Sequence, residues 1–177
     1  MLSWPDPLPA YGSVRLRPFR ESDLPLVAEL STDPYLPLIG TVPAIFTADA
    51  GRDYLHRQHQ RLRDGVGYSF AIADRADRAR GGAGLWPVGR GRARAGYVVA
   101  PAARGRGLAG DALRALTAFA WTLPDLDRVE AFIEPWNQAS IAVAERAGFV
   151  REALLPQHFE IGGRGRDMLR FALGRPA

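Results

Sequence analysis

The 177-residue sequence contains no cysteine and only three histidines. Without thiols, the chain can form neither disulfides nor thiolate metal sites. The histidines are His56, His59 and His158, and they lack the spacing of metal ligands. We therefore expect no metal in the function.

Long apolar runs are also absent. No stretch approaches the roughly 20 residues that a membrane-spanning helix needs. Residues 1–5 lack the basic and apolar regions of a secretory signal. These absences predict a soluble cytoplasmic protein without a membrane partner.

No repeat or long linker divides the chain. At 177 residues it is long enough to bury roughly 70% of its unfolded surface in one core. We expect a tail over residues 1–13 and a single domain over residues 14–174.

Lysine is missing as well, so all 23 basic residues are arginine. Residues 78–114 contain eight arginines and one acid, Asp111, whereas residues 21–53 are rich in acids. A nucleic-acid surface would be basic too, but no stacking aromatics alternate with these arginines. The sequence therefore favours a phosphate-bearing small molecule over a nucleic acid as the partner.

Hydrophobic periodicity predicts both strands and helices. Strands are expected over residues 14–17, 68–73, 82–88, 94–100, 128–134, 150–155 and 167–173. Helices are expected over residues 24–30, 48–63, 108–121 and 139–147, the third with Leu113, Leu116 and Ala120 inward. Residues 35–47, rich in proline and small residues, are expected to form a loop. Because a strand–helix–strand unit implies a parallel pair, the pattern predicts an α/β fold with a mixed, mostly antiparallel sheet of about seven strands.

The first chemically informative motif is Arg104-Gly105-Arg106-Gly107-Leu108-Ala109. It lies between the apolar residues 96–100 and the helix that begins near Leu108. Glycines allow close backbone approach, and the free N–H groups of a first helical turn attract anions. This arrangement is typical of pyrophosphate binding, although alone it is a weak signal.

The second motif surrounds the helix at residues 139–147. Asn137 is a good N-cap, Gly148 is a good left-handed terminator, and Phe149 is the apolar residue that often follows one. Helix capping explains each residue separately. It does not explain why this capped helix follows residues 132–136, one βα unit after the phosphate turn.

Together these motifs make residues 14–173 resemble the GNAT superfamily of acyl-CoA-dependent N-acyltransferases, in particular the branch of ribosomal-protein N-terminal acetyltransferases. The residues that match the two family motifs are Arg104, Gly107, Ala109, Asn137, Ser140, Gly148 and Phe149. The Gly96-Tyr97 pair, the Arg166-Asp167 pair and residues 14–18 are similar to this branch too.

The resemblance implies a GNAT-like fold, with a splayed parallel pair at the centre of the sheet and helices on both faces. It implies acetyl-CoA as co-substrate, with its pyrophosphate on the N–H groups of Arg104, Gly105, Arg106, Gly107, Leu108, Ala109 and Gly110. The pantetheine arm would lie between the strands that end near Ala100 and Glu134. A backbone N–H near Val98 or Val99 would polarise the thioester.

The same resemblance implies direct transfer to an amine, without an acyl-enzyme. Asn137 would contact the pantetheine arm, and Ser140 would donate a proton to the departing thiolate. Many members carry a tyrosine seven residues after the position of Asn137, but here that residue is Ala144. Ser140 or a water would therefore take its place.

The general base is less clear, because Arg94 and Ala95 stand where some members carry a glutamate. Glu134 is the first candidate, since it ends the strand beside the thioester. Other candidates are Glu130, His158 and Glu160. An α-amine of pKa about 8 is about one-tenth neutral at pH 7, but a lysine-type amine near ~10.4 is neutral about once in 2,500. Without a strong base, weakly basic amines are favoured.

The acceptor pocket is expected between residues 35–46 and residues 155–166. Phe46, Trp86, Trp136 and Phe159 would either line it or belong to the core, and Tyr97 would likewise serve only for packing.

We therefore expect an acetyl-CoA-dependent N-acetyltransferase acting on a primary amine of a peptide or small molecule. The alternatives are an aminoglycoside or other amino-sugar acetyltransferase, a non-catalytic acyl-CoA sensor, and an arginine-rich nucleic-acid binder. Homodimers are common in the branch that it resembles, but no interface stripe is readable in this sequence.

Overall fold

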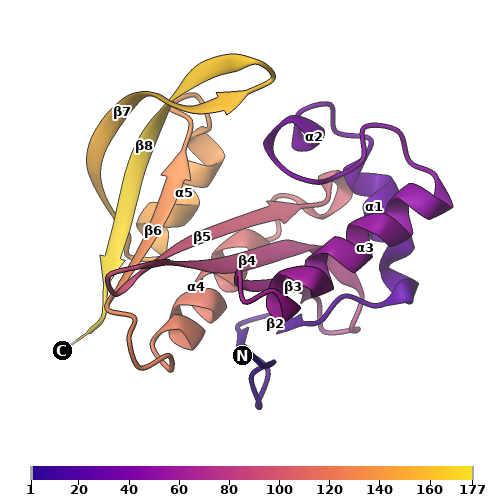
Figure 1. Cartoon of the computed structure of the whole chain (residues 1–177), viewed down its shortest axis with the longest axis horizontal. Helices are drawn as coiled ribbons and strands as arrows, with labels where there is room; N and C mark the ends of the chain where they lie inside the picture. The colour runs from indigo at the N-terminus through magenta and orange to yellow at the C-terminus, as the bar shows by residue number, and fades with distance from the viewer. Residues whose placement is uncertain (1, 177) are drawn as a thin grey trace.

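The computed structural model describes residues 2–176, and a single sheet runs through them (Figure 1). Its eight strands are β1 (Ala10–Tyr11), β2 (Val14–Arg17), β3 (Tyr68–Ala73), β4 (Ala79–Gly89), β5 (Arg92–Val99), β6 (Arg128–Ile133), β7 (Val150–Ile161) and β8 (Arg164–Gly174). They lie in the order β1-β2-β3-β4-β5-β6-β8-β7. All neighbours are antiparallel except β5 and β6. The predicted mixed, mostly antiparallel sheet is confirmed.

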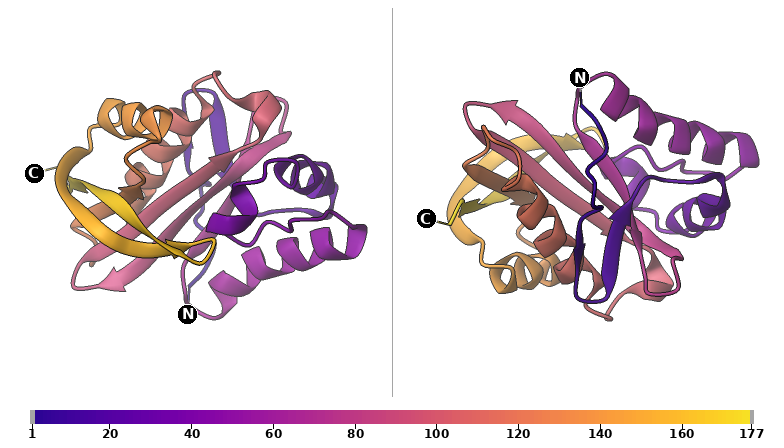
Figure 2. Two further views of the ribbon diagram at one scale, coloured as in Figure 1. Left: turned by 90° about the horizontal axis from the view of Figure 1, so that it is seen from above. Right: turned by 90° about the horizontal axis from the view of Figure 1, so that it is seen from below.

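Helices cover both faces of this sheet, as Figure 2 shows. The helices of the described chain are α1 (Leu24–Leu30), α2 (Leu36–Ile39), α3 (Ala48–Arg63), α4 (Leu108–Ala120) and α5 (Gln138–Arg146). Helices α1, α2 and α3 lie on one face, and α4 and α5 lie on the other. Within residues 2–176, no helix has both the length and the apolar character needed to cross a membrane.

Helix α4 forms much of the core on its face. Its inward residues follow the 3–4 spacing of an amphipathic helix, and Leu113, Leu116 and Ala120 are at most 1% exposed, as predicted. Fully burying a leucine side chain contributes about 1.5–3 kcal/mol. This helix therefore fixes the position of its own N-terminus at the end of β5.

The parallel pair separates soon after it forms. Strand β5 pairs with β6 only from Arg92–Arg94 to Arg128–Glu130, and beyond this point the two strands diverge (Figure 1). Strand β6 stays paired with β8 as far as Ile133. The divergence leaves the end of β5 without a neighbour on that side. The expected splayed parallel pair is present.

Three segments differ from the sequence prediction. Strand β1 lies within residues 1–13, expected to be a tail, and pairs with the start of β2. The expected loop at residues 35–47 contains the single turn α2, which is too short to show periodicity. The expected strands at residues 150–155 and 167–173 extend into one long hairpin, which turns at Gly162 and Gly163 with φ of +59° and +74°.

A buried ion pair joins β2 to the 3-10 turn Glu21–Asp23 in front of α1. The side chains of Arg17 and Asp23 are almost fully buried, and two N–O distances of 2.8 and 2.9 Å make the contact bidentate. Arg17 also donates to the Pro18 carbonyl and to the carboxylate and carbonyl of Asp77. All five guanidinium N–H groups therefore have partners.

Candidate active site

The predicted phosphate turn has the backbone geometry that anion binding requires. Gly105 and Gly107 have φ of +76° and +78°, a region that favours glycine. Within residues 2–176, the N–H groups of residues 105–110 form no hydrogen bond. They precede or begin the 13-residue helix α4, and the turn itself is exposed. A row of free N–H groups at a helix N-terminus is suited to pyrophosphate.

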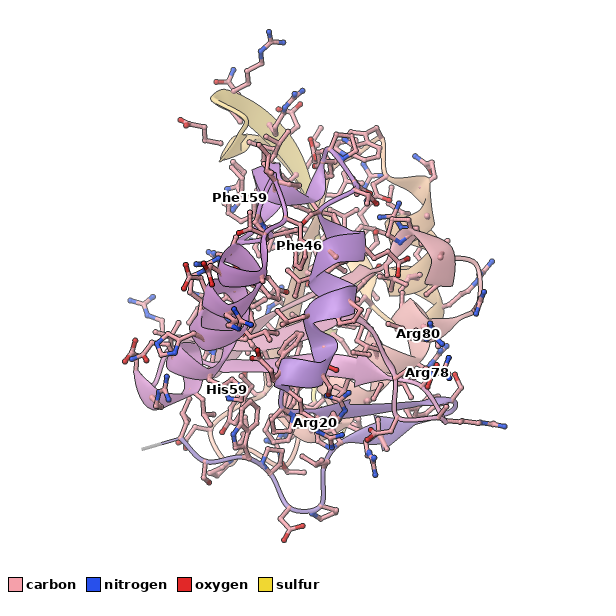
Figure 3. All side chains as sticks on the ribbon, turned by 90° about the vertical axis from the view of Figure 1, so that its right-hand side faces the viewer. Arg20, Phe46, His59, Arg78, Arg80 and Phe159 are labelled. Carbon is pink, nitrogen blue, oxygen red and sulfur yellow. The ribbon has the colours of Figure 1, made fainter. Side chains whose placement is uncertain are left out.

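The two arginines of this turn differ in their surroundings. The Arg104 guanidinium donates to the Val99 carbonyl (3.1 Å) and to Asp33 (2.5 Å), so it ties the turn to the α1–α2 segment. Arg106 is exposed. Figure 3 shows Arg78 and Arg80 near each other where the chain enters β4, and the Arg80 carbonyl accepts from the N–H of Ala100. Arg80 and Arg104 thus lie at the end of β5, whereas Arg92 and Arg94 of the same basic segment lie at its start.

The end of β5 presents one backbone N–H to the gap. The Ala100 N–H donates to Arg80 of the neighbouring chain segment at 2.8 Å. Successive N–H groups alternate sides along a strand, so that of Val98 also faces β4 and that of Val99 faces away from it. Of the two groups expected to polarise a thioester, only Val99 points into the gap between β5 and β6.

A cavity of about 680 Å³ opens beside this gap. It is lined by both segments that the sequence predicted, including Leu38 and Thr41 on one side and Phe159 and Glu160 on the other. Four predicted site residues also line it: Val98, Glu134, Asn137 and Ser140. The tertiary structure therefore brings the strand ends, the start of α5 and the expected acceptor segments to one place.

Glu134 follows the last residue of β6 and lies at the cavity. The residue is only 7% exposed, and its Oε2 atom is buried without a hydrogen-bond partner in the described chain. Leaving a buried carboxylate oxygen unpaired is unfavourable. Such an atom is a natural acceptor for a proton or hydrogen bond from a ligand.

Helix α5 begins as the sequence predicted. The Asn137 Oδ1 atom accepts from the Ser140 N–H at 3.1 Å, so Asn137 is the N-cap. Gly148, with φ of +90°, ends the helix, and Phe149 is buried beneath it. The cap leaves the Asn137 amide nitrogen and the Ser140 hydroxyl free to meet a ligand.

Tyr97 contributes a hydroxyl that the sequence did not single out. It lines the cavity, and its Oη atom is buried without a hydrogen bond of normal geometry in residues 2–176. Burial raises the pKa of Tyr97, while the nearby Ser140 hydroxyl partly opposes that rise. Ala144, which stands where many relatives carry tyrosine, lines the same cavity. Tyr97 and Ser140 thus supply two hydroxyls to the cavity, in which Ala144 replaces the tyrosine of many relatives.

The other candidate bases have different surroundings. Glu130 is buried on β6 and accepts from Arg128 at 2.9 Å. His158 stacks on Phe132 with ring centroids 5.2 Å apart. Glu160 lines the cavity but is exposed on β7. Glu134 alone among these four combines burial, a free oxygen and a place at the cavity.

The aromatic predictions divide in two. Trp86 and Phe159 line the cavity, whereas Phe46 and Trp136 do not belong to its lining. Phe46 lies instead against α3, where a Cβ atom on Gly51 would be 2.8 Å from its ring, and Figure 3 shows it in front of the helices. Trp136 is 59% exposed and packs edge-on against Tyr35. Phe132, which the sequence did not single out, completes the aromatic wall.

Glycines around Trp86 shape the floor of the cavity. Gly84 and Gly96 pair across β4 and β5, and a Cβ atom on Gly84 would lie 2.3 Å from the Trp86 ring. A Cβ on Gly96 would lie 3.2 Å from the same ring. The indole can therefore lie against this part of the sheet only because both positions lack side chains.

Two arginines also line the cavity: Arg61, which the sequence did not single out, and Arg94, which stands where some family members carry a glutamate. No group of three or more histidine, cysteine, aspartate or glutamate residues arranged to hold a metal ion occurs in the described part of the chain.

Comparison with known proteins identifies the family. Residues 13–150 match the family model described as "Acetyltransferase (GNAT) domain". The Bacillus subtilis (strain 168) protein named "Probable N-acetyltransferase YjcK" is 29% identical over 135 residues, which cover 74% of this chain and 75% of that protein.

Solved structures share the fold at lower identity. Mycobacterium smegmatis RimJ, in complex with a CoA disulfide, is 24% identical with a TM-score of 0.80, covering 97% of this chain and 90% of that chain. Vibrio cholerae spermidine N-acetyltransferase, in complex with CoA and spermine, is 19% identical with a TM-score of 0.73, covering 92% and 95%. These TM-scores show that this chain shares the overall fold of both structures.

The family match, the named relative and the splayed sheet agree with one another, and acetyl-CoA is the co-substrate. The chain belongs to the GNAT family and is an acetyl-CoA-dependent N-acyltransferase.

Proposed function

We propose that this enzyme transfers an acetyl group directly to a weakly basic primary amine, such as the α-amine of a peptide or small molecule. Glu134 receives the amine proton, and Ser140 together with Tyr97 protonates the leaving thiolate. The observation that carries this proposal is the buried Glu134 carboxylate, which keeps one unpaired oxygen at a cavity shared with both hydroxyls.

The residues of the chain fit acetyl-CoA in two places. The free N–H groups of residues 105–110 suit its pyrophosphate, and the gap between β5 and β6 suits its pantetheine arm. The Asn137 amide, whose oxygen caps α5, would hold the arm through its nitrogen. Acetyl-CoA supplies an activated acetyl group as a thioester.

Each proton in this reaction has a donor and an acceptor. The amine nitrogen forms a bond to the carbonyl carbon, the carbon–sulfur bond breaks, and the sulfur keeps the electron pair. The Val99 N–H stabilises negative charge on the carbonyl oxygen. Glu134 accepts the proton that the amine loses, and Ser140 gives a proton to the sulfur. Tyr97, whose phenol burial keeps protonated, returns a proton to Ser140. Water then reprotonates Tyr97 and takes the proton from Glu134, which restores both groups.

The class of amine acceptor follows from the acid and the base that the site provides. The demand on the acid is modest, because a thiol of pKa near ~8.5 leaves readily as thiolate. The demand on the base is larger and depends on the amine. A single buried carboxylate is adequate for an α-amine of pKa about 8 but poor for an amine near ~10.4.

The test is CoA release from acetyl-CoA by the purified protein with a panel of N-terminal peptides, amino acids, polyamines and aminoglycosides. We expect release with α-amines and a product heavier by one acetyl group in mass spectrometry. Release with a blocked-terminus lysine peptide equal to that with a free-terminus peptide would contradict the proposed acceptor class.

Two variants test the assigned roles. Ser140→Ala and Tyr97→Phe each remove one hydroxyl of the acid pair, and general acid catalysis contributes roughly 10²–10⁴-fold. We expect kcat to fall in both, with a smaller fall in Tyr97→Phe because Ser140 still meets the sulfur. Ser3→Ala is the matched control, because that hydroxyl lies outside the cavity lining. Unchanged kcat in both variants would show that the acid is another group or water.

A further inference from the structure

Two guanidinium groups face the acceptor side of the cavity without an acidic partner. Arg61, in the last turn of α3, donates to the Gln58 side chain (2.7 Å) and to the Ser69 hydroxyl (3.0 Å). Arg94, on β5, rests on Phe132 and Phe159, with its Cζ atom 5.2 and 5.6 Å from their ring centroids. In residues 2–176, neither guanidinium lies within 4.0 Å of a carboxylate. Both charges are thus available to a ligand.

The two charges lie on the same wall of the cavity. Trp86 and Arg94 are direct partners across β4 and β5, so their side chains share one face of the sheet. The Arg61 guanidinium lies over the Trp86 ring at 5.9 Å from its centroid. The wall therefore combines two arginines with flat aromatic surfaces, which hold guanidinium planes in place.

The surroundings of Arg61 disfavour its positive charge as long as no anion is paired with it. The side chain is half-buried, and burial lowers its pKa. Arg57, one helical turn earlier, lowers it further by like-charge repulsion, and the remaining titratable neighbour is the phenol of Tyr54. Partly buried cations are normally paired. An anion entering the cavity would relieve both effects.

Glu134 and Arg94 reach the cavity from neighbouring strands. Arg94 pairs with Glu130 of β6, and its guanidinium rests on Phe132, two residues before Glu134, which follows the end of β6. An acceptor whose amine meets Glu134 can therefore extend along β6 toward Arg94.

We propose that the acceptor carries a carboxylate in addition to its reactive amine, and that Arg94 and Arg61 bind this carboxylate. This inference rests on the proposed function and narrows its substrate class. Arginine matches a carboxylate because its planar fork donates two parallel hydrogen bonds. A dipeptide offers such a carboxylate at its C-terminus, and a longer peptide offers one on an acidic side chain near its N-terminus. A polyamine or aminoglycoside would instead bring further positive charge to a wall that is already positive.

The experiment compares acceptors that differ only in this charge. The probes are the dipeptide Ala-Ala, its C-terminal amide, Ala-Glu amide, Ala-Gln amide and spermidine, each assayed by CoA release with saturating acetyl-CoA. Charge-assisted hydrogen bonds discriminate by roughly 10- to 100-fold. We expect kcat/KM for each carboxylate acceptor to exceed that of its amide by about this factor, mainly through KM. The first pair tests a C-terminal carboxylate, and the second pair tests a side-chain carboxylate.

Variants separate recognition from a structural role. Arg94→Gln and Arg61→Gln should each reduce the ratio of carboxylate to amide activity, and Arg94→Lys should restore part of it. A merely structural role would lower activity on both acceptors equally and leave their ratio intact. Arg63→Gln is the control, because that exposed arginine of α3 hydrogen-bonds only to Gln60 among residues 2–176 and lies outside the cavity lining. It should leave both activities unchanged.

The outcomes are distinguishable from failure of the proposed function. Turnover of amides or spermidine at least as fast as of carboxylates would overturn this inference while amine acetylation stands. A carboxylate preference that survives in both glutamine variants would overturn the assignment to Arg61 and Arg94. Absence of CoA release with every α-amine would overturn the proposed function and this inference with it.

Discussion

Glu134→Gln should produce a defect that shrinks as the pH rises. The substitution preserves the size of a residue that is 7% exposed and whose Oε2 atom lacks a partner in the described chain. No ion pair involving Glu134 is lost among the described residues, so the fold should be retained. General base catalysis contributes roughly 10²–10⁴-fold, so kcat/KM at pH 7 should fall at least about 100-fold.

The pH dependence follows from the ionisation of the acceptor. An α-amine of pKa about 8 is about one-tenth neutral at pH 7 and about nine-tenths neutral at pH 9. An enzyme without a base can use only the neutral fraction. The activity of Glu134→Gln should therefore rise about tenfold over this interval, while the wild-type activity stays nearly constant. For an amine near ~10.4 the corresponding rise in the variant would be roughly 100-fold.

The assay is CoA release at saturating acetyl-CoA, with kcat/KM for one peptide acceptor measured between about pH 7 and pH 9. Glu160→Gln is the matched control, because Glu160 lines the same cavity but is exposed. Its profile should follow that of the wild type. A defect of Glu134→Gln that stays constant with pH, or an equal profile in Glu160→Gln, would refute the assignment of the base.

Three further predictions concern the framework of the site. Arg17→Met leaves Asp23 buried without its bidentate partner, and breaking such a pair costs about 3–5 kcal/mol. The Tm measured by calorimetry should therefore fall by roughly 10 °C. A fall in Tm below about 2 °C would contradict this prediction. Hydrogen bonds from Arg20, Arg15 and Arg17 hold the pKa of Asp77 well below its usual range, so its stabilising effect is complete above about pH 4 and is lost as the pH falls toward that depressed pKa. Asp77→Asn should therefore weaken the acid dependence of the urea midpoint below about pH 4, and an unchanged slope there would count against the assignment. Gly84→Ala places a Cβ atom 2.3 Å from the Trp86 ring, which should lower the free energy of unfolding by about 1–3 kcal/mol. The KM for the acceptor should rise more than the KM for acetyl-CoA. Gly174→Ala is the control, because Gly174 has open space around it, and it should change neither KM.

Local patterns in the sequence predicted much of the fold. The inward face of α4, the cap at Asn137 and the terminator at Gly148 all occur as expected, because each depends on residues within a few positions of one another. The extent of the β7–β8 hairpin was missed for a related reason. Most residues between 156 and 166 are exposed, so no alternation of apolar and polar residues marks them as strand.

The family motifs indicated the co-substrate, because a phosphate turn is itself a local structure. Gly105 and Gly107 have the positive φ values that this turn requires, and the N–H groups of residues 105–110 follow from it. The order and pairing of the strands decided the remaining features of the co-substrate site. The direction of the Val99 N–H depends on its pairing with β4, and the gap depends on where β5 and β6 separate.

The sequence by itself determined the helices other than α2, most of the strands, the phosphate turn and the family. Only the tertiary structure brought the Tyr97 hydroxyl beside Ser140 and directed Arg61 and Arg94 into the cavity with Glu134. These side chains come from segments far apart in the chain. Their meeting is fixed by sheet topology and by packing on both faces, which no short-range periodicity encodes.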